Sequence, residues 1–253
     1  LISTGGEDTG NGFADHGMAG NTGIAFGPLV AVILLWVTGW RVVTFVLAIP
    51  AFVAVGYILK ANIDEMAAAQ LQTDGSGSDD GDITSLNQLL SASKTLFLGG
   101  FVFVFLIIIF NGLYYRGILT FLPELLSDFV DIGFFESSEV TGEQLNGSDL
   151  IYVGLLIVGI AGQYVGGKMT ERINVEKGLL MGYGALVLIA LLYIPAAQSG
   201  LRFLIAISFL LGFCLFLLQP FYQVAVAEYS SADSRGLSYG FTYLAQFGFG
   251  ALG

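Results

Sequence analysis

The chain has very little cysteine and histidine: its 253 residues include one cysteine, Cys214, and one histidine, His16. No disulfide can form within the chain, because that bond needs two cysteines. A Cys/His zinc site is excluded as well, since it needs three or four such ligands. A catalytic triad with a histidine base would have to use His16, which we interpret as a surface residue in a loop. We therefore expect no catalytic residues, no metal, no cofactor and no enzymatic activity.

Charge is also scarce, and it is unevenly placed. Charged residues make up 11% of the chain and hydrophobic residues 55%, whereas soluble proteins are about 25% charged. This composition is typical of a membrane protein. The net charge is -11, and 16 of the 20 acidic residues precede Leu150, nearly all in polar connecting segments. Acidic, lysine-poor loops repel nucleic acid and suggest a halophile, because salt screens their self-repulsion.

Long hydrophobic runs dominate the sequence. A helix needs about 20 apolar residues to cross a bilayer, and seven uncharged runs of about that length follow one another. Lipid leaves only helices or closed barrels able to satisfy the backbone, and barrel strands would alternate in shorter segments. We therefore predict an all-α, polytopic transmembrane bundle in the cell membrane, with residues 1–16 as a loop. The runs cover residues 17–40, 42–59, 95–115, 150–167, 178–201, 203–227 and 236–253.

The basic residues of the polar gaps predict the orientation. Loops that carry more Lys and Arg face the cytoplasm, and six of these residues fall on one predicted face. The opposite loops carry Arg41 and Arg202. The acidic segment 61–93 is then a cytoplasmic linker: its TDGSGSDDGD is flexible, and its flanks IDEMAAAQL and ITSLNQLL are compatible with short amphipathic helices. The residues of the predicted cytoplasmic face are Lys60, Lys94, Lys168, Arg172, Lys177 and Arg235.

Two motifs stand out, one inside the first span and one at the cytoplasmic end of a later span. In GIAFGP, Gly23 and Gly27 leave one helix face bare for a neighbouring helix, and Pro28 bends the helix. The alternative is ordinary helix packing. In GKMTER, which runs from Gly167 to Arg172, a carboxylate and basic groups can bond to neighbouring helix termini. Such a latch would hold one conformation, whereas the alternative is simple positive-inside anchoring.

These motifs resemble those of the major facilitator superfamily of secondary transporters. GIAFGP is similar to the fifth-helix signature GxxxGP of its proton-coupled antiporters, although Ala31 and Val32 replace a usual glycine pair. Gly167, Glu171 and Arg172 resemble the family's loop signature between helices eight and nine, and Asn174 replaces its usual glycine there. The stretch YYRGILTFLPELL resembles the outer half of helix seven.

The resemblance implies a fragment that covers about helices five to eleven of twelve. Residues 1–60 would end the N-terminal half, 61–93 would be the linker, and 94–253 would form most of the C-terminal half. It also implies alternating access around a central site, driven by an ion gradient. A proton-coupled carrier or efflux antiporter is one form, and an uptake carrier for an organic or inorganic anion is the alternative.

Polar residues inside the spans are the candidate substrate site. Arg116 interrupts an apolar run, and a charge in that position is a functional-site hypothesis by default. It either faces the central cavity, where it binds an anionic group or pairs with a coupling acid, or snorkels to the headgroups. The remaining candidates share helical stripes, for which the alternative is hydrogen bonding between helices. They are Thr120, Gln219, Gln223, Tyr239, Thr242, Tyr243 and Gln246.

Other membrane proteins fit less well. A retinal protein needs a lysine in its last span, and residues 236–253 contain none. A channel needs a continuous polar pore, whereas these spans hold scattered amides. A membrane-embedded enzyme needs a cluster of His, Cys or acidic residues at membrane depth, and the predicted spans contain no such cluster. The expected partners are a small solute, a coupling ion and the lipid bilayer, with the protein acting as a monomer.

Overall fold

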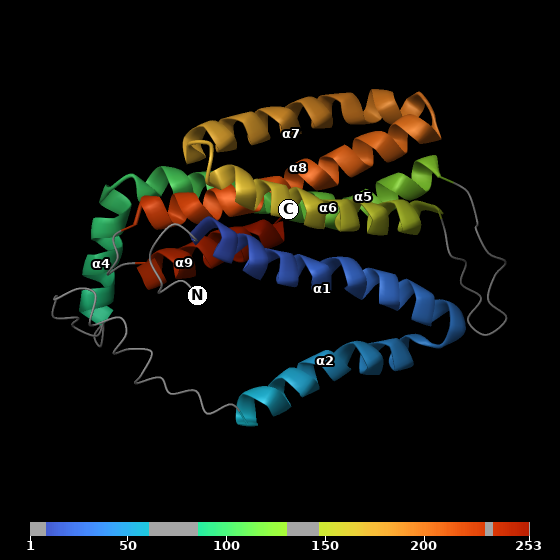
Figure 1. Cartoon of the computed structure of the whole chain (residues 1–253), viewed down its shortest axis with the longest axis horizontal. Coiled ribbons are helices and arrows are strands. Elements are labelled where there is room, and N and C mark those ends of the chain that lie inside the picture. Colours follow the sequence, from blue (N-terminus) through green and yellow to red (C-terminus); the bar gives the residue numbers. More distant parts are fainter. Residues whose placement is uncertain (1–8, 61–85, 131–146, 231–234, 253) are drawn as a thin grey trace.

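A computed structural model describes residues 9–60, 86–130, 147–230 and 235–252. These described residues form helices and turns, with no strand among them, which confirms the all-α prediction. Figure 1 shows α1 and α5 to α8 lying side by side in a bundle, with α4 across one end and α2 diverging from α1. The elements are α1 (Thr9–Val37), α2 (Trp40–Lys60), α4 (Leu86–Leu98), α5 (Phe101–Phe129), α6 (Gly147–Thr170), α7 (Val175–Gln198), α8 (Leu201–Glu228), α9 (Arg235–Tyr243), a π-helical segment η2 (Leu244–Gly248) and a 3-10 turn η3 (Phe249–Leu252).

Five of these helices, α2 and α5 to α8, are long and apolar enough to cross a membrane. In α1 the apolar part is shorter and covers Thr22–Leu35. The last hydrophobic run is divided among α9, η2 and η3. The polytopic bundle predicted from hydropathy is therefore present, while the first and last of the seven runs differ from simple spanning helices.

Two predicted boundaries were wrong. Helix α1 begins at Thr9, within the stretch predicted to be a loop, although glycine has a weak helix propensity. The run of residues 95–115 is divided at Gly99 and Gly100 between α4 and α5. A Cβ at Gly100 would lie 2.6 Å from Cδ1 of Tyr229, so glycine is needed where the chain turns. Helix α4 confirms the short helix expected in ITSLNQLL, whereas IDEMAAAQL and TDGSGSDDGD lie outside the described residues.

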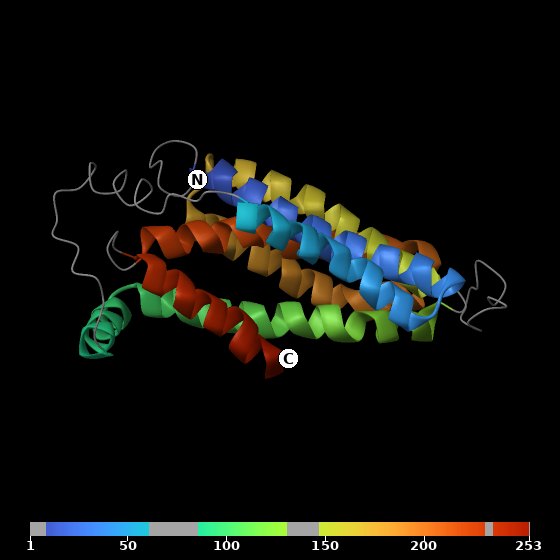
Figure 2. The same ribbon diagram turned by 90° about the horizontal axis from the view of Figure 1, so that it is seen from below.

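Helix α8 lies at the centre of the bundle and packs against α6 and α7 (Figure 2). Glycines permit this close approach. A Cβ at Gly162 or Gly166 of α6 would collide with backbone carbonyl groups of α8, at Leu217 in the case of Gly166. On α7, a Cβ at Gly178 would collide with the ring of Phe221. Because small residues let helix backbones approach closely in lipid, these glycines determine how tightly the bundle packs.

The glycines of the GIAFGP motif behave differently. No described atom outside the local backbone lies within 4 Å of the position that a Cβ would take at Gly23 or Gly27. Pro28 lies inside α1, as expected for a bent helix. Among the described residues, glycines such as those of α6 and α7 lie at close helix contacts, and the two glycines of this motif do not.

The two ends of the bundle differ in charge. Figure 1 shows the end of α2, all of α4, the turn between α6 and α7, and the start of α9 at one end. That end carries the six basic residues predicted to face the cytoplasm. The opposite end holds the turns from α1 to α2 and from α7 to α8, with Arg41 and Arg202. The sorting of basic residues into two groups thus matches the two ends of the bundle.

Candidate functional site

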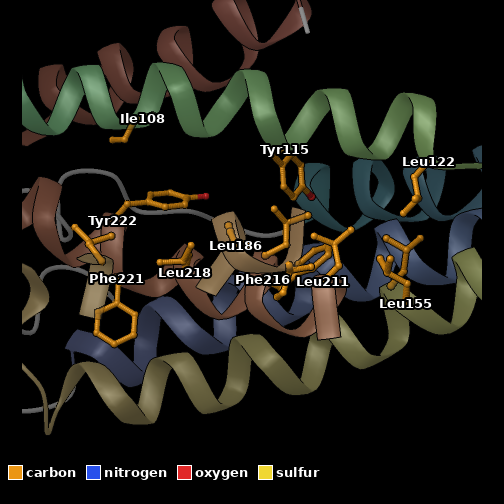
Figure 3. Close-up of a cluster of buried hydrophobic side chains, with 14 of the residues drawn as sticks. Ile108, Tyr115, Leu122, Leu155, Leu186, Leu211, Phe216, Leu218, Phe221 and Tyr222 are labelled. Atoms are coloured by element: carbon orange, nitrogen blue, oxygen red, sulfur yellow. The ribbon is translucent and has the colours of Figure 1, made fainter. Parts of the chain in front are cut away.

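Two tyrosine–glutamine pairs lie between α5, α8 and η2. The amide Nε2 of Gln246 donates to the hydroxyl of Tyr222 at 3.0 Å, and that hydroxyl lies 3.4 Å from Oε1 of the same amide. Tyr115 and Gln219 share a second side-chain hydrogen bond. All four residues are buried. Figure 3 shows Tyr115 and Tyr222 among the apolar side chains that fill the space between α5 and α8. These pairs therefore form a buried polar layer inside an apolar bundle.

The π-helical geometry of η2 places Gln246 in this layer. Two glycines allow the close approach of η2 and η3 to α5: a Cβ at Gly112 would lie 2.7 Å from the carbonyl oxygen of Gln246, and one at Gly250 would lie 3.1 Å from the carbonyl oxygen of Gly112. Single π-helical turns inside helices occur frequently at functional sites. The position of Gln246 is thus set jointly by the local backbone and by the glycine contact with α5.

A third polar group lies beside these pairs. The hydroxyl of Tyr239 donates to the backbone carbonyl of Gln223 at 3.3 Å. The side-chain oxygen of Gln223 is buried, and no described residue donates a hydrogen bond to it. The hydroxyl of Thr242 donates to the carbonyl of Ser238 at 2.9 Å, within its own helix. The side-chain oxygen of Gln223 can therefore still accept a hydrogen bond inside the bundle. The hydroxyl of Thr242 already donates to the backbone of its own helix.

Three exposed residues form a cluster beside η2. They are Arg116 of α5, Tyr243 at the end of α9 and Phe247 of η2. The guanidinium carbon of Arg116 lies 5.3 Å from the centre of the Phe247 ring. The rings of Tyr243 and Phe247 are stacked, with centroids 6.0 Å apart and planes 12° apart. A cation within about 6 Å of an aromatic centroid is attracted by the ring. We call these three residues the Arg116 cluster.

The eight predicted substrate-site residues do not form one surface. Thr120 is exposed one turn beyond Arg116. Tyr239, Thr242, Tyr243 and Gln246, expected as one stripe, are divided: Tyr243 is 53% exposed, whereas Thr242 and Gln246 are buried. The stripe assumed α-helical geometry, and the wider π turn changes the register at Gln246. The set consists of buried Gln219, Thr242 and Gln246, half-buried Gln223 and Tyr239, and exposed Arg116, Thr120 and Tyr243.

Sequence reasoning missed two polar residues of the bundle interior, Tyr222 and Gln163. Tyr222 was not named, although it lies between Gln219 and Gln223 in the sequence. Tyr115 was expected beside Arg116 as a partner for it, and the structure instead shows it bonded to Gln219. Gln163 of α6 is fully buried, and neither atom of its amide has a hydrogen-bond partner among the described residues. The available signal for Gln163 was that it is an amide inside an otherwise apolar span.

The GKMTER motif forms the turn between α6 and α7. Gly167 is buried in the last turn of α6, whereas Glu171 and Arg172 are exposed. A depression with a volume of ≈ 420 Å³ lies at this end of the bundle, and residues 170–176 line it together with Glu228 of α8. The last residues of the motif and the end of α8 therefore lie on the same surface. This arrangement fits a latch between the two elements as well as an anchor.

Tyr229 connects three elements at the same end. Its hydroxyl donates to Oε1 of Glu176 in the first turn of α7 at 2.9 Å, and this hydrogen bond raises the pKa of Tyr229. Its ring lies against Gly100, between α4 and α5. Tyr229 follows the last residue of α8. The ends of α5, α7 and α8 are therefore in contact through one side chain.

The described residues contain no group of three or more His, Cys, Asp or Glu side chains that could hold a metal ion. Comparison with curated proteins and with solved structures gave no match. The family model of the Major Facilitator Superfamily matches residues 3–253. That match covers nearly the whole chain and agrees with the helical, membrane-spanning bundle described above. The chain therefore belongs to the Major Facilitator Superfamily, a family of membrane transporters.

Proposed function

We propose that the protein is a secondary active transporter that moves a small anionic solute by alternating access, with the Arg116 cluster as its anion site. The observation that carries this proposal is Arg116 itself. It lies near the middle of α5, a helix long and apolar enough to span the membrane. A lipid-facing arginine at the centre of a membrane costs about 2.5–3.5 kcal/mol on insertion scales, and such residues usually face a water-filled cavity.

The geometry around Arg116 suits an anion. The guanidinium carbon lies 5.3 Å from the centre of the Phe247 ring, and the planar guanidinium can form a two-bond contact with carboxylate or phosphate. Among the described residues, no carboxylate forms an ion pair with Arg116. The stacked ring of Tyr243 extends the aromatic surface beside it. Thr120, exposed one turn further along α5, offers a hydroxyl to the same solute.

The buried pairs have a supporting role in this proposal. Gln246 and Tyr222 connect η2 to α8, and η2 carries Phe247. Gln219 connects α8 to α5, the helix of Arg116, through Tyr115. We propose that these pairs hold Phe247 opposite Arg116, and that Gln223, Tyr239 and Thr242 belong to the same polar wall.

An ion gradient, most simply of protons, would drive the cycle. Along α5 and α8 the carboxylates lie toward helix ends, as Glu124 and Glu228 do. The coupling group is therefore proposed to lie elsewhere in the transporter. A proton-coupled efflux antiporter is the second candidate, which is supported by GIAFGP in α1 with Pro28 inside the helix. The end of the bundle that holds α4 is proposed to be cytoplasmic, because it carries six of the nine Lys and Arg residues.

Uptake and counterflow in proteoliposomes test this function. Radiolabelled succinate, benzoate and phosphate serve as probes, and counterflow distinguishes a carrier from a channel. We expect Arg116→Lys to lower uptake of the transported anion at least about tenfold, because lysine lacks the planar fork. The matched control is Arg202→Lys, an exposed arginine in the first turn of α8, which should transport normally. Wild-type uptake by Arg116→Lys would contradict the anion site and favour an interfacial anchor.

A further inference from the structure

We propose that the solute is an aromatic monocarboxylate, whose carboxylate binds Arg116 and whose ring stacks on Tyr243 and Phe247. This inference rests on the anion site proposed above and names the class of solute that fits it. The observation behind it is that the Arg116 cluster combines one cation with two aromatic rings, and all three side chains are exposed. An inorganic anion would bind the cation and leave the two rings without a role.

The stem of Arg116 packs against the segment that follows the rings. Figure 2 shows the chain after α9 lying beside α5. A Cβ at Gly250 of η3 would lie 3.3 Å from Cγ of Arg116, so a glycine there lets η3 approach the arginine closely. The guanidinium carbon lies 5.3 Å from the centre of the Phe247 ring. Because the cation and the rings are this close, a solute that uses both must carry its anionic group close to its own ring.

The two rings provide a flat surface for such a solute. Their planes are 12° from parallel, and Tyr243 and Phe247 are 53% and 43% exposed. A water-filled cavity that lowers the cost of the charge on Arg116 also borders these rings, because they lie beside the guanidinium. Apolar surface in contact with water is unfavourable. A flat aromatic ring that covers the pair removes this surface from water and adds the attraction between stacked rings.

The charge of the cluster fits a single carboxylate. The chain has nine Lys and Arg residues, and those other than Arg116 lie in α4, in turns or near helix ends. A dicarboxylate or a doubly charged phosphate would therefore find no second cation at this depth among the described residues. An unpaired charge in a site of low dielectric constant is costly, and a monocarboxylate avoids this cost.

Equilibrium binding to the full chain, purified in detergent, tests the class of solute. The probes are benzoate, succinate and cyclohexanecarboxylate, which has the charge and ring size of benzoate but no aromatic face. We expect benzoate to bind more tightly than succinate, and about two- to tenfold more tightly than cyclohexanecarboxylate, as aromatic stacking predicts. Phe247→Leu should remove the preference over cyclohexanecarboxylate, and Phe247→Tyr should retain it. Phe249→Leu is the matched control, because Phe249 is 42% exposed and has no ring or cation partner among the described residues.

The outcomes distinguish this inference from the anion site on which it rests. If benzoate and cyclohexanecarboxylate bind equally well and Arg116→Lys weakens both, the anion site stands and the aromatic class is wrong. A preference for benzoate that survives Phe247→Leu would also overturn the stacking role. If no probe binds, or if Arg116→Lys binds all of them as the wild type does, both proposals are wrong. If Phe247→Leu does not fold, Tyr243→Leu should lower the preference and Tyr243→Phe should keep it.

Discussion

The side-chain amide of Gln246 donates a 3.0 Å hydrogen bond to the hydroxyl of Tyr222, which joins the π-helical segment η2 to α8. Tyr222→Phe removes this hydroxyl and leaves the buried amide without that partner. Hydrogen bonds between membrane helices contribute roughly 0.6 kcal/mol on average and up to about 1.7 kcal/mol. We therefore expect a loss of thermal stability of that order in detergent for Tyr222→Phe.

A double-mutant cycle checks that the effect belongs to this pair. The losses of Tyr222→Phe and Gln246→Leu should not add in the double variant, because either change alone breaks the bond. Tyr164→Phe serves as the control, since Tyr164 is half exposed on α6. Additive losses would mean that the two residues act independently.

The second prediction concerns the glycines of α6. Gly166→Ala places a methyl group against the carbonyl of Leu217, so α6 and α8 must move apart. Overpacking of this kind costs about 1–3 kcal/mol. Gly184→Ala is the matched control, because no described atom outside the local backbone lies within 4 Å of its Cβ position on α7. Thermal unfolding in detergent should show a lower midpoint for the first variant alone. Equal midpoints would contradict the close contact of α6 and α8.

The third prediction concerns Gln163. It is fully buried on α6, and its amide has no hydrogen-bond partner among the described residues. A buried unsatisfied polar group costs about 1–3 kcal/mol. Gln163→Leu, which has a similar size and no polar atom, should therefore raise the thermal midpoint. Gln198→Leu, at the exposed end of α7, should leave it unchanged. A lower midpoint for Gln163→Leu would show that the amide has a partner in the folded protein.

The fourth prediction concerns the turn between α6 and α7. Glu171→Gln and Arg172→Gln should change the transport rate more than the affinity for solute measured at equilibrium in a fixed state. The reason is that both residues border the depression beside Glu228, where a latch would stabilise one conformation. Lys177→Gln, also exposed near this turn, is the control. Unchanged rates in both variants would mean that Glu171 and Arg172 are membrane anchors.

Hydropathy by itself predicted the fold class and the spanning helices. The uncharged runs from residue 42 to residue 227 correspond to the five long apolar helices, apart from the change at Gly99 and Gly100. This succeeded because transfer into lipid is a sum over consecutive residues, so a run of about 20 apolar residues is a sufficient signal. The basic residues separated into two groups for a similar reason, since each group lies toward the helix ends at one end of the bundle.

Tertiary structure decided which polar and glycine residues meet. Gly100, where the chain turns, cannot carry a side chain because the ring of Tyr229, far along the sequence, occupies that space. Gln246 pairs with Tyr222 because η2 is π-helical and packs against Gly112. Each of these contacts joins residues more than 20 positions apart, and helical periodicity describes only neighbours three or four positions apart. A stripe of polar residues can therefore be recognised in the sequence, whereas its partners depend on how the helices pack.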